Sequence, residues 1–198
     1  MSNMPINISC VGDSITQWSG YPDDLQMMLG EDFKVGNFGV AESAVSTEWF
    51  KPYVNQPAFQ DSKAFAPDIV VIMLGTNDAH TYQSEQNFAT DYENLVSEYL
   101  SLPSRPRVIL VKPPPIYNNT LELSGSNLDD NVIPAIDQVA QDLNLTTVDV
   151  NNALINHPEL FQDGVHPTSD GAMVIAAQID DAINLYDTSY EQVPDLSS

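Results

Sequence analysis

Five stretches of the chain have the length and the residue pattern of a β-strand, with apolar residues in each. The two clearest, 68–74 and 107–111, are nearly continuous in valine, isoleucine and leucine. Continuous apolar runs are typical of strands covered on both faces, as in a parallel sheet. The segments that we expect to form strands are 6–11, 34–38, 68–74, 107–111 and 146–150.

Segments with apolar residues at helical spacing lie between these runs. The last of them is the clearest, and Thr168 can cap its first turn. Its apolar stripe consists of Ala172, Ile175, Ala176, Ile179 and Ile183. The expected helices cover about 21–29, 83–100, 127–143 and 168–186.

The alternation of strands and helices predicts an α/β sandwich around a parallel sheet of about five strands. No internal repeat or linker interrupts the pattern. We therefore expect one domain over 1–186, followed by a polar tail over 187–198 that frays.

The charge of the chain limits its partners. With 28 acidic and 6 basic residues, the formal net charge is −22. Such a chain repels phosphate backbones, anionic membranes and strongly anionic substrates, so we expect no nucleic-acid or membrane partner. Acid excess commonly forms a solvated surface, but its scale here also suggests adaptation to high salt.

Targeting signals are lacking in this sequence. No apolar run approaches the ~18 residues of a membrane span, and residues 1–5 lack the features of a signal peptide.

Cys10 is the lone cysteine and lies in an apolar run, which indicates a core thiol. These features favour a cytoplasmic location, although a leader removed before residue 1 would leave no trace. The oligomeric state is not indicated.

Residues that can carry chemistry follow the predicted strands. Gly12-Asp13-Ser14 follows the first strand, Gly39 the second and Gly75-Thr76-Asn77-Asp78 the third, while Asp163-Gly164-Val165-His166 precedes the last helix. Ligands of open α/β sheets bind outside the carboxyl ends of the strands. A hydroxyl, a glycine amide, a carboxamide and an acid–imidazole pair together are the groups that acyl transfer requires.

These segments resemble the four sequence blocks of the GDSL/SGNH hydrolases. GDSIT at 12–16, the Asn-Phe-Gly segment at 37–39, GTND at 75–78 and DGVHP at 163–167 occur in the family's order. Each block is short, but together they span most of the chain. The resemblance implies a flavodoxin-like, three-layer α/β/α sandwich, which agrees with the strand pattern.

The resemblance also implies roles for individual residues. Ser14 would be the nucleophile, His166 its base and later acid, and Asp163 the group that orients the imidazole. The oxyanion hole would use the main-chain amides of Ser14 and Gly39 and the side chain of Asn77. The sequence shows no metal-ligand spacing and no phosphate-binding glycine loop, so we expect no metal and no cofactor.

Neighbours of these blocks are expected to contact the substrate. They are Asp13, Glu42, Asp78, His80, Ile116 and Val165. One of them marks a departure from the family, whose members commonly continue after the second block with another glycine and a threonine. Here residues 40–44 read Val-Ala-Glu-Ser-Ala, and Glu42 adds charge near the expected mouth of the site.

Each candidate residue also has a purely structural interpretation. Ser14 could cap a helix, Gly39 could serve only a turn, and Asn77 with Asp78 could form an Asx-turn. His166 could simply precede the last helix. The four blocks in order favour the catalytic interpretation over these alternatives.

The expected function is hydrolysis of a carboxylic ester with a short acyl group, because the chain has no room for a lid or a lipid-binding insertion. Acetyl on a carbohydrate is favoured, since residues 111–115 and the block order are similar to small carbohydrate acetylesterases of the family. An arylesterase, thioesterase or lysophospholipase is the alternative among enzymes. A catalytically silent carbohydrate-binding module is the alternative from another class.

Overall fold

The computed structural model describes residues 4–79 and 85–190, excepting the side chains of 85–86 and 186–190. Its centre is a five-stranded sheet in the order β2-β1-β3-β4-β5, and all four pairings are parallel. This order is that of flavodoxin-like sheets, so the predicted parallel α/β fold is confirmed. The strands are β1 (Ile6–Gly12), β2 (Phe33–Gly39), β3 (Ile69–Met73), β4 (Arg107–Lys112) and β5 (Thr146–Asp149).

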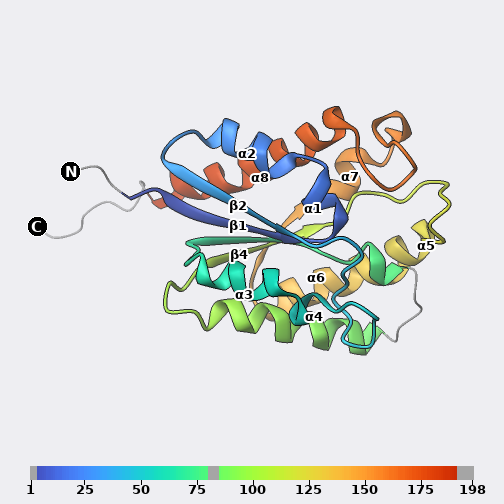
Figure 1. Ribbon diagram of the computed structural model, residues 1–198, viewed down its shortest axis with the longest axis horizontal. Helices are drawn as coiled ribbons and strands as arrows, with labels where there is room; N and C mark the ends of the chain where they lie inside the picture. Colours follow the sequence, from blue (N-terminus) through green and yellow to red (C-terminus); the bar gives the residue numbers. More distant parts are fainter. Residues whose placement is uncertain (1–3, 80–84, 191–198) are drawn as a thin grey trace, which may run out of the picture.

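Helices cover both faces of the sheet and complete three layers (Figure 1). On one face lie α1 (Ser14–Trp18), α2 (Tyr21–Leu29), α7 (Val150–Leu154) and α8 (Ser169–Tyr190). On the other lie α3 (Pro57–Ala64), α4 (Glu85–Leu100) and α6 (Ile133–Asp142), the last preceded by α5 (Gly125–Asn127) and a π-helical turn, Leu128–Val132. Short 3-10 turns occur at Tyr53–Asn55, Asn77–Ala79 and Pro158–Leu160.

Each face of the sheet has its own hydrophobic core. In the fully buried strand β3, Val70 and Ile72 belong to the core beneath α4 and α6, whereas Val71 and Met73 belong to the core beneath α2 and α8. The split follows from the alternation of side chains along a strand. Cys10 lies in the second core, where burial raises the pKa of its thiol to about 12, so the predicted core thiol is confirmed.

The helices differ from the sequence prediction at several places, and among them the short helix α7 was not predicted. The helix expected over 127–143 is divided into α5, the π-helical turn and α6, and a proline stands in the first turn of α6. Helix α3 was not predicted, because it buries only Phe59 and Ser62 and therefore has no apolar stripe. Helix α8 continues to Tyr190, beyond the expected end near 186. The rest of the expected tail lies outside the described residues.

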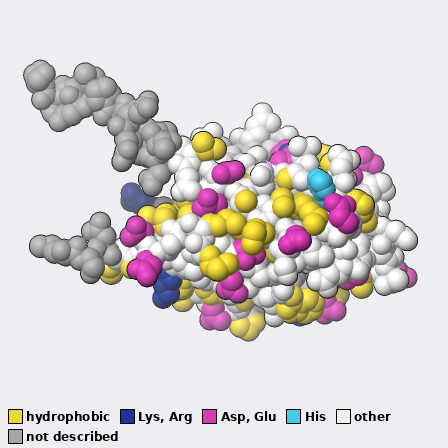
Figure 2. All heavy atoms as spheres, turned by 90° about the horizontal axis from the view of Figure 1, so that it is seen from above, with side chains coloured by type: hydrophobic (Ala, Val, Ile, Leu, Met, Phe, Trp, Pro, Cys, Tyr) yellow, Lys and Arg dark blue, Asp and Glu magenta, His cyan; other side chains and the backbone are white. Residues whose placement is uncertain are grey.

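Figure 2 views the face that α2 and α8 cover, and acidic side chains are scattered across it. The basic side chains visible in this view lie toward one end of the molecule. Such dispersed acids are what a solvated acidic surface requires. Within the described part of the chain, no helix combines the length and the apolar character needed to cross a bilayer.

Candidate active site

Ser14 stands at the carboxyl end of β1, where the chain turns directly into α1. The carboxylate of Asp13 caps this helix, because its Oδ1 accepts a hydrogen bond from the Ile15 amide at 2.9 Å. Ser14 is the first helical residue, so its hydroxyl does not have the capping role. The turn requires glycine before it, since a Cβ on Gly12 would lie 1.9 Å from Thr16 Oγ1.

The fold brings Ser14 next to His166, 152 positions later in the chain. The Ser14 Oγ lies 2.9 Å from His166 Nε2. On the other side of the ring, His166 Nδ1 lies 2.7 Å from Asp163 Oδ2. Asp163 Oδ1 accepts hydrogen bonds from the amides of Val165 and His166, which closes a tight turn. Gly164 has a φ of +85° in this turn, a conformation that glycine adopts readily.

The protonation of Asp163 determines which imidazole nitrogen carries the hydrogen. Burial raises the pKa of Asp163, but the hydrogen bonds from the His166 amide and ring outweigh it, and the net pKa is lowered. An ionised carboxylate only accepts hydrogen bonds, so Nδ1 of His166 must donate. In the neutral ring Nε2 then carries the lone pair that faces the Ser14 hydroxyl.

Asn77 reaches the same region from the turn after β3. Its Nδ2 donates a hydrogen bond to the Ser43 carbonyl at 2.8 Å, which fixes the orientation of the carboxamide. A carboxamide has two N–H groups, so one remains for a ligand. Asn77 and Ser14 line one cavity of about 360 Å³.

The main-chain amide of Gly39 does not have the position that was predicted for it. Its amide donates to Asn37 Oδ1 at 3.0 Å, and the residue does not line the cavity with Ser14. The structure therefore does not place the Gly39 amide in an oxyanion hole, contrary to the prediction. Glycine is needed here for packing, because a Cβ would lie 2.3 Å from the Gln17 amide nitrogen in α1.

Glu42, three residues later, lines that cavity. Its φ is +64°, an uncommon conformation for a residue with a side chain. No described residue accepts a hydrogen bond from its main-chain amide.

The cavity is lined by three aromatic side chains that the sequence pattern does not predict there, Trp18, Trp49 and Phe50. Of the residues predicted to contact substrate, Glu42 and Val165 line it, whereas Ile116 is half-buried and packs against the core beneath α4 and α6. His80 lies outside the described residues. The cavity residues that were not predicted are Trp18, Trp49, Phe50, Leu121 and Leu123.

Asp13 and Asp78 are buried beside the cavity rather than lining it. The two oxygens of Asp78 accept hydrogen bonds from the amides of Val45 and Ser46, at 3.0 and 2.9 Å. Asp13 Oδ2 is buried and meets no hydrogen-bond partner among the described residues. Burial raises the pKa of Asp13 to about 7 and that of Asp78 to about 6. Both carboxyls therefore support the loops of the site instead of presenting themselves to a ligand.

Trp18 separates this cavity from a second one of about 230 Å³ on the Asp163 side of the imidazole, and it lines both. The centres of the Trp18 and His166 rings are 5.9 Å apart. Within the described residues, no group of three or more His, Cys, Asp or Glu side chains is placed to hold a metal ion.

Known proteins with a similar sequence or fold include several esterases. An acetylxylan esterase of Xylanibacter ruminicola is 30% identical over 206 residues, covering 90% of this chain and 43% of that protein. The chain thus spans less than half the length of this curated relative.

Two solved structures share the fold at low identity. A carbohydrate acetylesterase from Sinorhizobium meliloti matches with a TM-score of 0.74 and 17% identity, over 91% of this chain and 99% of that one. The aryl esterase of M. smegmatis matches with a TM-score of 0.70 and 18% identity, over 91% and 99%.

The family comparison covers most of the chain. The GDSL-like lipase/acylhydrolase family matches residues 10–174, a range that contains Ser14, Asn77, Asp163 and His166. The chain belongs to the GDSL-like lipase/acylhydrolase family.

Proposed function

We propose that this protein hydrolyses carboxylic esters with Ser14 as the nucleophile. The observation that carries the proposal is the unbroken hydrogen-bonded series Ser14 Oγ, His166 Nε2, His166 Nδ1 and Asp163 Oδ2 at the wall of a cavity. A serine hydroxyl is a weak nucleophile until a base takes its proton, and this geometry supplies the base.

In the first half of the reaction, Ser14 Oγ forms a bond to the ester carbonyl carbon while His166 Nε2 takes the hydroxyl proton. The carbonyl oxygen becomes an oxyanion, and Asp163 stabilises the positive imidazole. The intermediate collapses with cleavage of the bond to the alcohol oxygen, which receives the proton from His166. In the second half, water attacks the acyl-enzyme with the same base and releases the acid and Ser14.

Three donors are proposed for the oxyanion. The Ser14 amide is available because the first residues of a helix have no intrahelical acceptor. The second donor is the free N–H of Asn77, whose carboxamide is held by the Ser43 carbonyl. We assign the third to the Glu42 amide in place of the Gly39 amide, because it belongs to the cavity wall and has no acceptor among the described residues.

A short acyl group is proposed, with acetyl on a carbohydrate as the favoured ester. The similarity to an acetylxylan esterase and the fold shared with a carbohydrate acetylesterase support this choice. The aromatic cavity walls also suit an aryl ester, which is the second candidate, and the shared fold of an aryl esterase is consistent with it. A silent carbohydrate-binding module is less favoured, because binding alone does not require the Ser14–His166–Asp163 series.

The proposal is tested by turnover of p-nitrophenyl esters from acetyl to long-chain, together with acetylated xylan and a phenyl acetate series. We expect the highest kcat/KM for acetyl esters and release of acetate from the polymer. A preference for long acyl chains would contradict the short-acyl proposal. Absence of hydrolysis with every ester would favour the binding module.

A further inference from the structure

The loop over 42–50 is held in place from two sides. Asp78 accepts hydrogen bonds from the amides of Val45 and Ser46, and Asp91 of helix α4 accepts from the amide and hydroxyl of Thr47 at 2.7 and 3.0 Å. A loop that is fixed before a ligand arrives loses little conformational entropy on binding. The side chains that this loop presents to the cavity are therefore a preformed surface.

Two aromatic rings of this loop stand at the cavity. Trp49 and Phe50 have ring centres 4.9 Å apart, and the Trp49 indole donates to the Glu42 carbonyl at 2.9 Å. Phe50 is 70% exposed, and Trp18 on the other wall is 64% exposed. Large exposed aromatic side chains gathered at one cavity mark a ligand-contacting surface. Their faces carry negative potential and attract the slightly positive C–H groups of a saturated ring.

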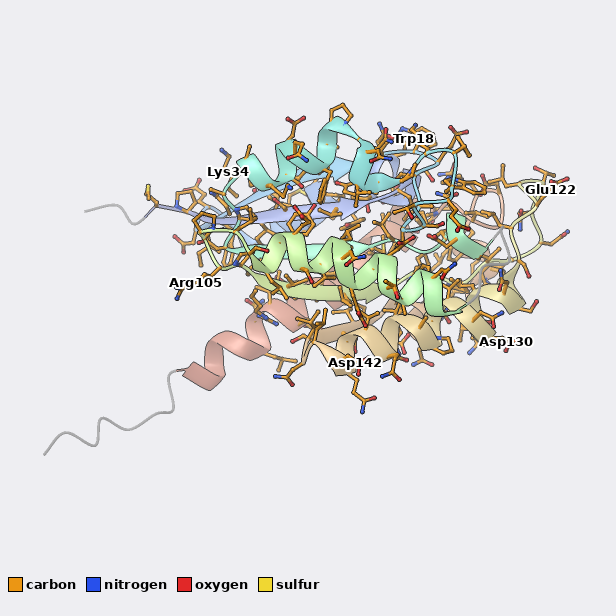
Figure 3. All side chains as sticks on the ribbon, turned by 90° about the horizontal axis from the view of Figure 1, so that it is seen from below. Trp18, Lys34, Arg105, Glu122, Asp130 and Asp142 are labelled. Carbon is orange, nitrogen blue, oxygen red and sulfur yellow. The ribbon has the colours of Figure 1, made fainter. Side chains whose placement is uncertain are left out.

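Glu42 gives this surface a negative charge without a compensating cation. Its side chain forms no ion pair and no hydrogen bond with a described residue, and it is exposed. Among the described residues that line the cavity, Glu42 and His166 are the two that can ionise. Lys51, the residue after Phe50, does not line the cavity. Figure 3 shows Lys34 and Arg105 at the end of the molecule opposite Trp18.

We infer that Glu42, Trp49 and Phe50 form a subsite for the alcohol part of the ester, and that this alcohol is a neutral, polyhydroxylated ring such as a sugar residue. The inference rests on the proposed esterase function. The aromatic faces contact the C–H groups of the ring, and the Glu42 carboxylate accepts hydrogen bonds from neighbouring hydroxyls. An alcohol bearing a carboxylate is disfavoured, because two negative charges would meet with no cation between them.

The test compares two acetyl esters of nearly the same shape that differ in charge, an acetylated methyl glucuronide and its neutral carboxamide. The wild-type protein should prefer the neutral ester by at least about tenfold in kcat/KM. Glu42→Gln should reduce this preference at least about fivefold, because it removes the charge and keeps the shape. Glu48→Gln is the matched control, since Glu48 is an exposed acid of the same loop that does not line the cavity. It should retain the wild-type preference.

Salt gives a second readout of the same charge. At 1 M NaCl the Debye length is about 3 Å, so the wild-type preference should shrink while that of Glu42→Gln changes little. An equal preference in the wild type and Glu42→Gln would overturn the subsite. If Ser14→Ala kept its activity toward both esters, the proposed function would fail instead, so the two failures are distinguishable.

Binding can be measured without turnover. The chain has two tryptophans, Trp18 and Trp49, and both line the cavity. A neutral xylo-oligosaccharide should change their fluorescence on titration, and Phe50→Ala, a change at an exposed position, should weaken that binding at least about fivefold. Equal binding of a neutral oligosaccharide and a uronic-acid oligosaccharide by the wild type would also overturn the inference.

Discussion

Replacement of Asp13 by asparagine should change how stability depends on pH. The Asp13 carboxyl is buried beside the nucleophile, and its Oδ2 meets no partner among the described residues. Burial raises its pKa from 3.8 to about 7, although the Ile15 amide and the charge of His166 act in the opposite direction. In Asp13→Asn, the remaining Oδ1 can still cap α1, because asparagine is as good an N-cap as aspartate.

The direction in which native stability changes with pH follows from the number of protons bound in the native and unfolded states. Between pH 4 and 7 the native carboxyl retains a proton that the unfolded chain has released, so native stability falls as pH rises. Below pH 3.8 the Asp13 carboxyl is protonated in both the native and the unfolded state, and above about pH 7 it is ionised in both. The loss of native stability is therefore confined to the window between these two values. Each pH unit corresponds to about 1.4 kcal/mol, which gives about 4 kcal/mol for Asp13 over the whole window.

The assay is urea unfolding at fixed ionic strength from pH 4 to 9, monitored by tryptophan fluorescence. The other acids titrate in both proteins, so the difference between Asp13→Asn and the wild type isolates Asp13. The variant should gain about 4 kcal/mol relative to the wild type between pH 4 and 8, and the difference should then level off. If the difference in unfolding free energy between Asp13→Asn and the wild type stayed constant with pH, the conclusion that the buried Asp13 carboxyl retains its proton would be refuted.

Other expectations follow from the same structure. His166→Ala should lose about as much kcat as Ser14→Ala, and the double variant should lose little more, because the two residues act as a unit; fully multiplied losses would contradict this. Asn77→Ala should lower kcat by about 10²–10³ with a smaller change in KM, as removal of an oxyanion donor does; a change in KM alone would argue against the role. The melting temperature should rise between 0.01 and 1 M NaCl, as the Debye length falls from about 30 to about 3 Å; a flat titration would remove the case for salt adaptation.

The sequence pattern predicted the strands and the position of the site because both depend on local signals. The apolar run at 69–73 is visible without any partner, and the residues after each strand meet at one edge of a parallel sheet. Helix α3 was not predicted because its sequence has no apolar residues repeated at helical spacing. The extent of α8 beyond 186 was missed because the residues that follow, Asp187, Thr188 and Ser189, are polar and do not continue the apolar stripe.

The errors at the site arise from contacts that are distant in the sequence. A glycine required by packing against α1 looks the same in sequence as one that makes room for a substrate, and Gly39 is of the first kind. Glu42 has a positive φ, a backbone conformation that is usually occupied by glycine. A glutamate at this position therefore gives no sequence signal for the turn. Asp78 binds amides that lie more than thirty positions away, and no local pattern reveals that its carboxyl faces inward.

The central claim is that Ser14 is the nucleophile, and covalent labelling tests it most directly. The protein is incubated with an organophosphonate ester, digested and mapped by mass spectrometry, with Ser14→Ala as the matched control. We expect one adduct per chain on Ser14, loss of esterase activity in proportion to labelling, and neither labelling nor hydrolysis in Ser14→Ala with an unchanged unfolding curve. An adduct on another residue, or hydrolysis by Ser14→Ala at more than a few per cent of the wild-type rate, would contradict the account.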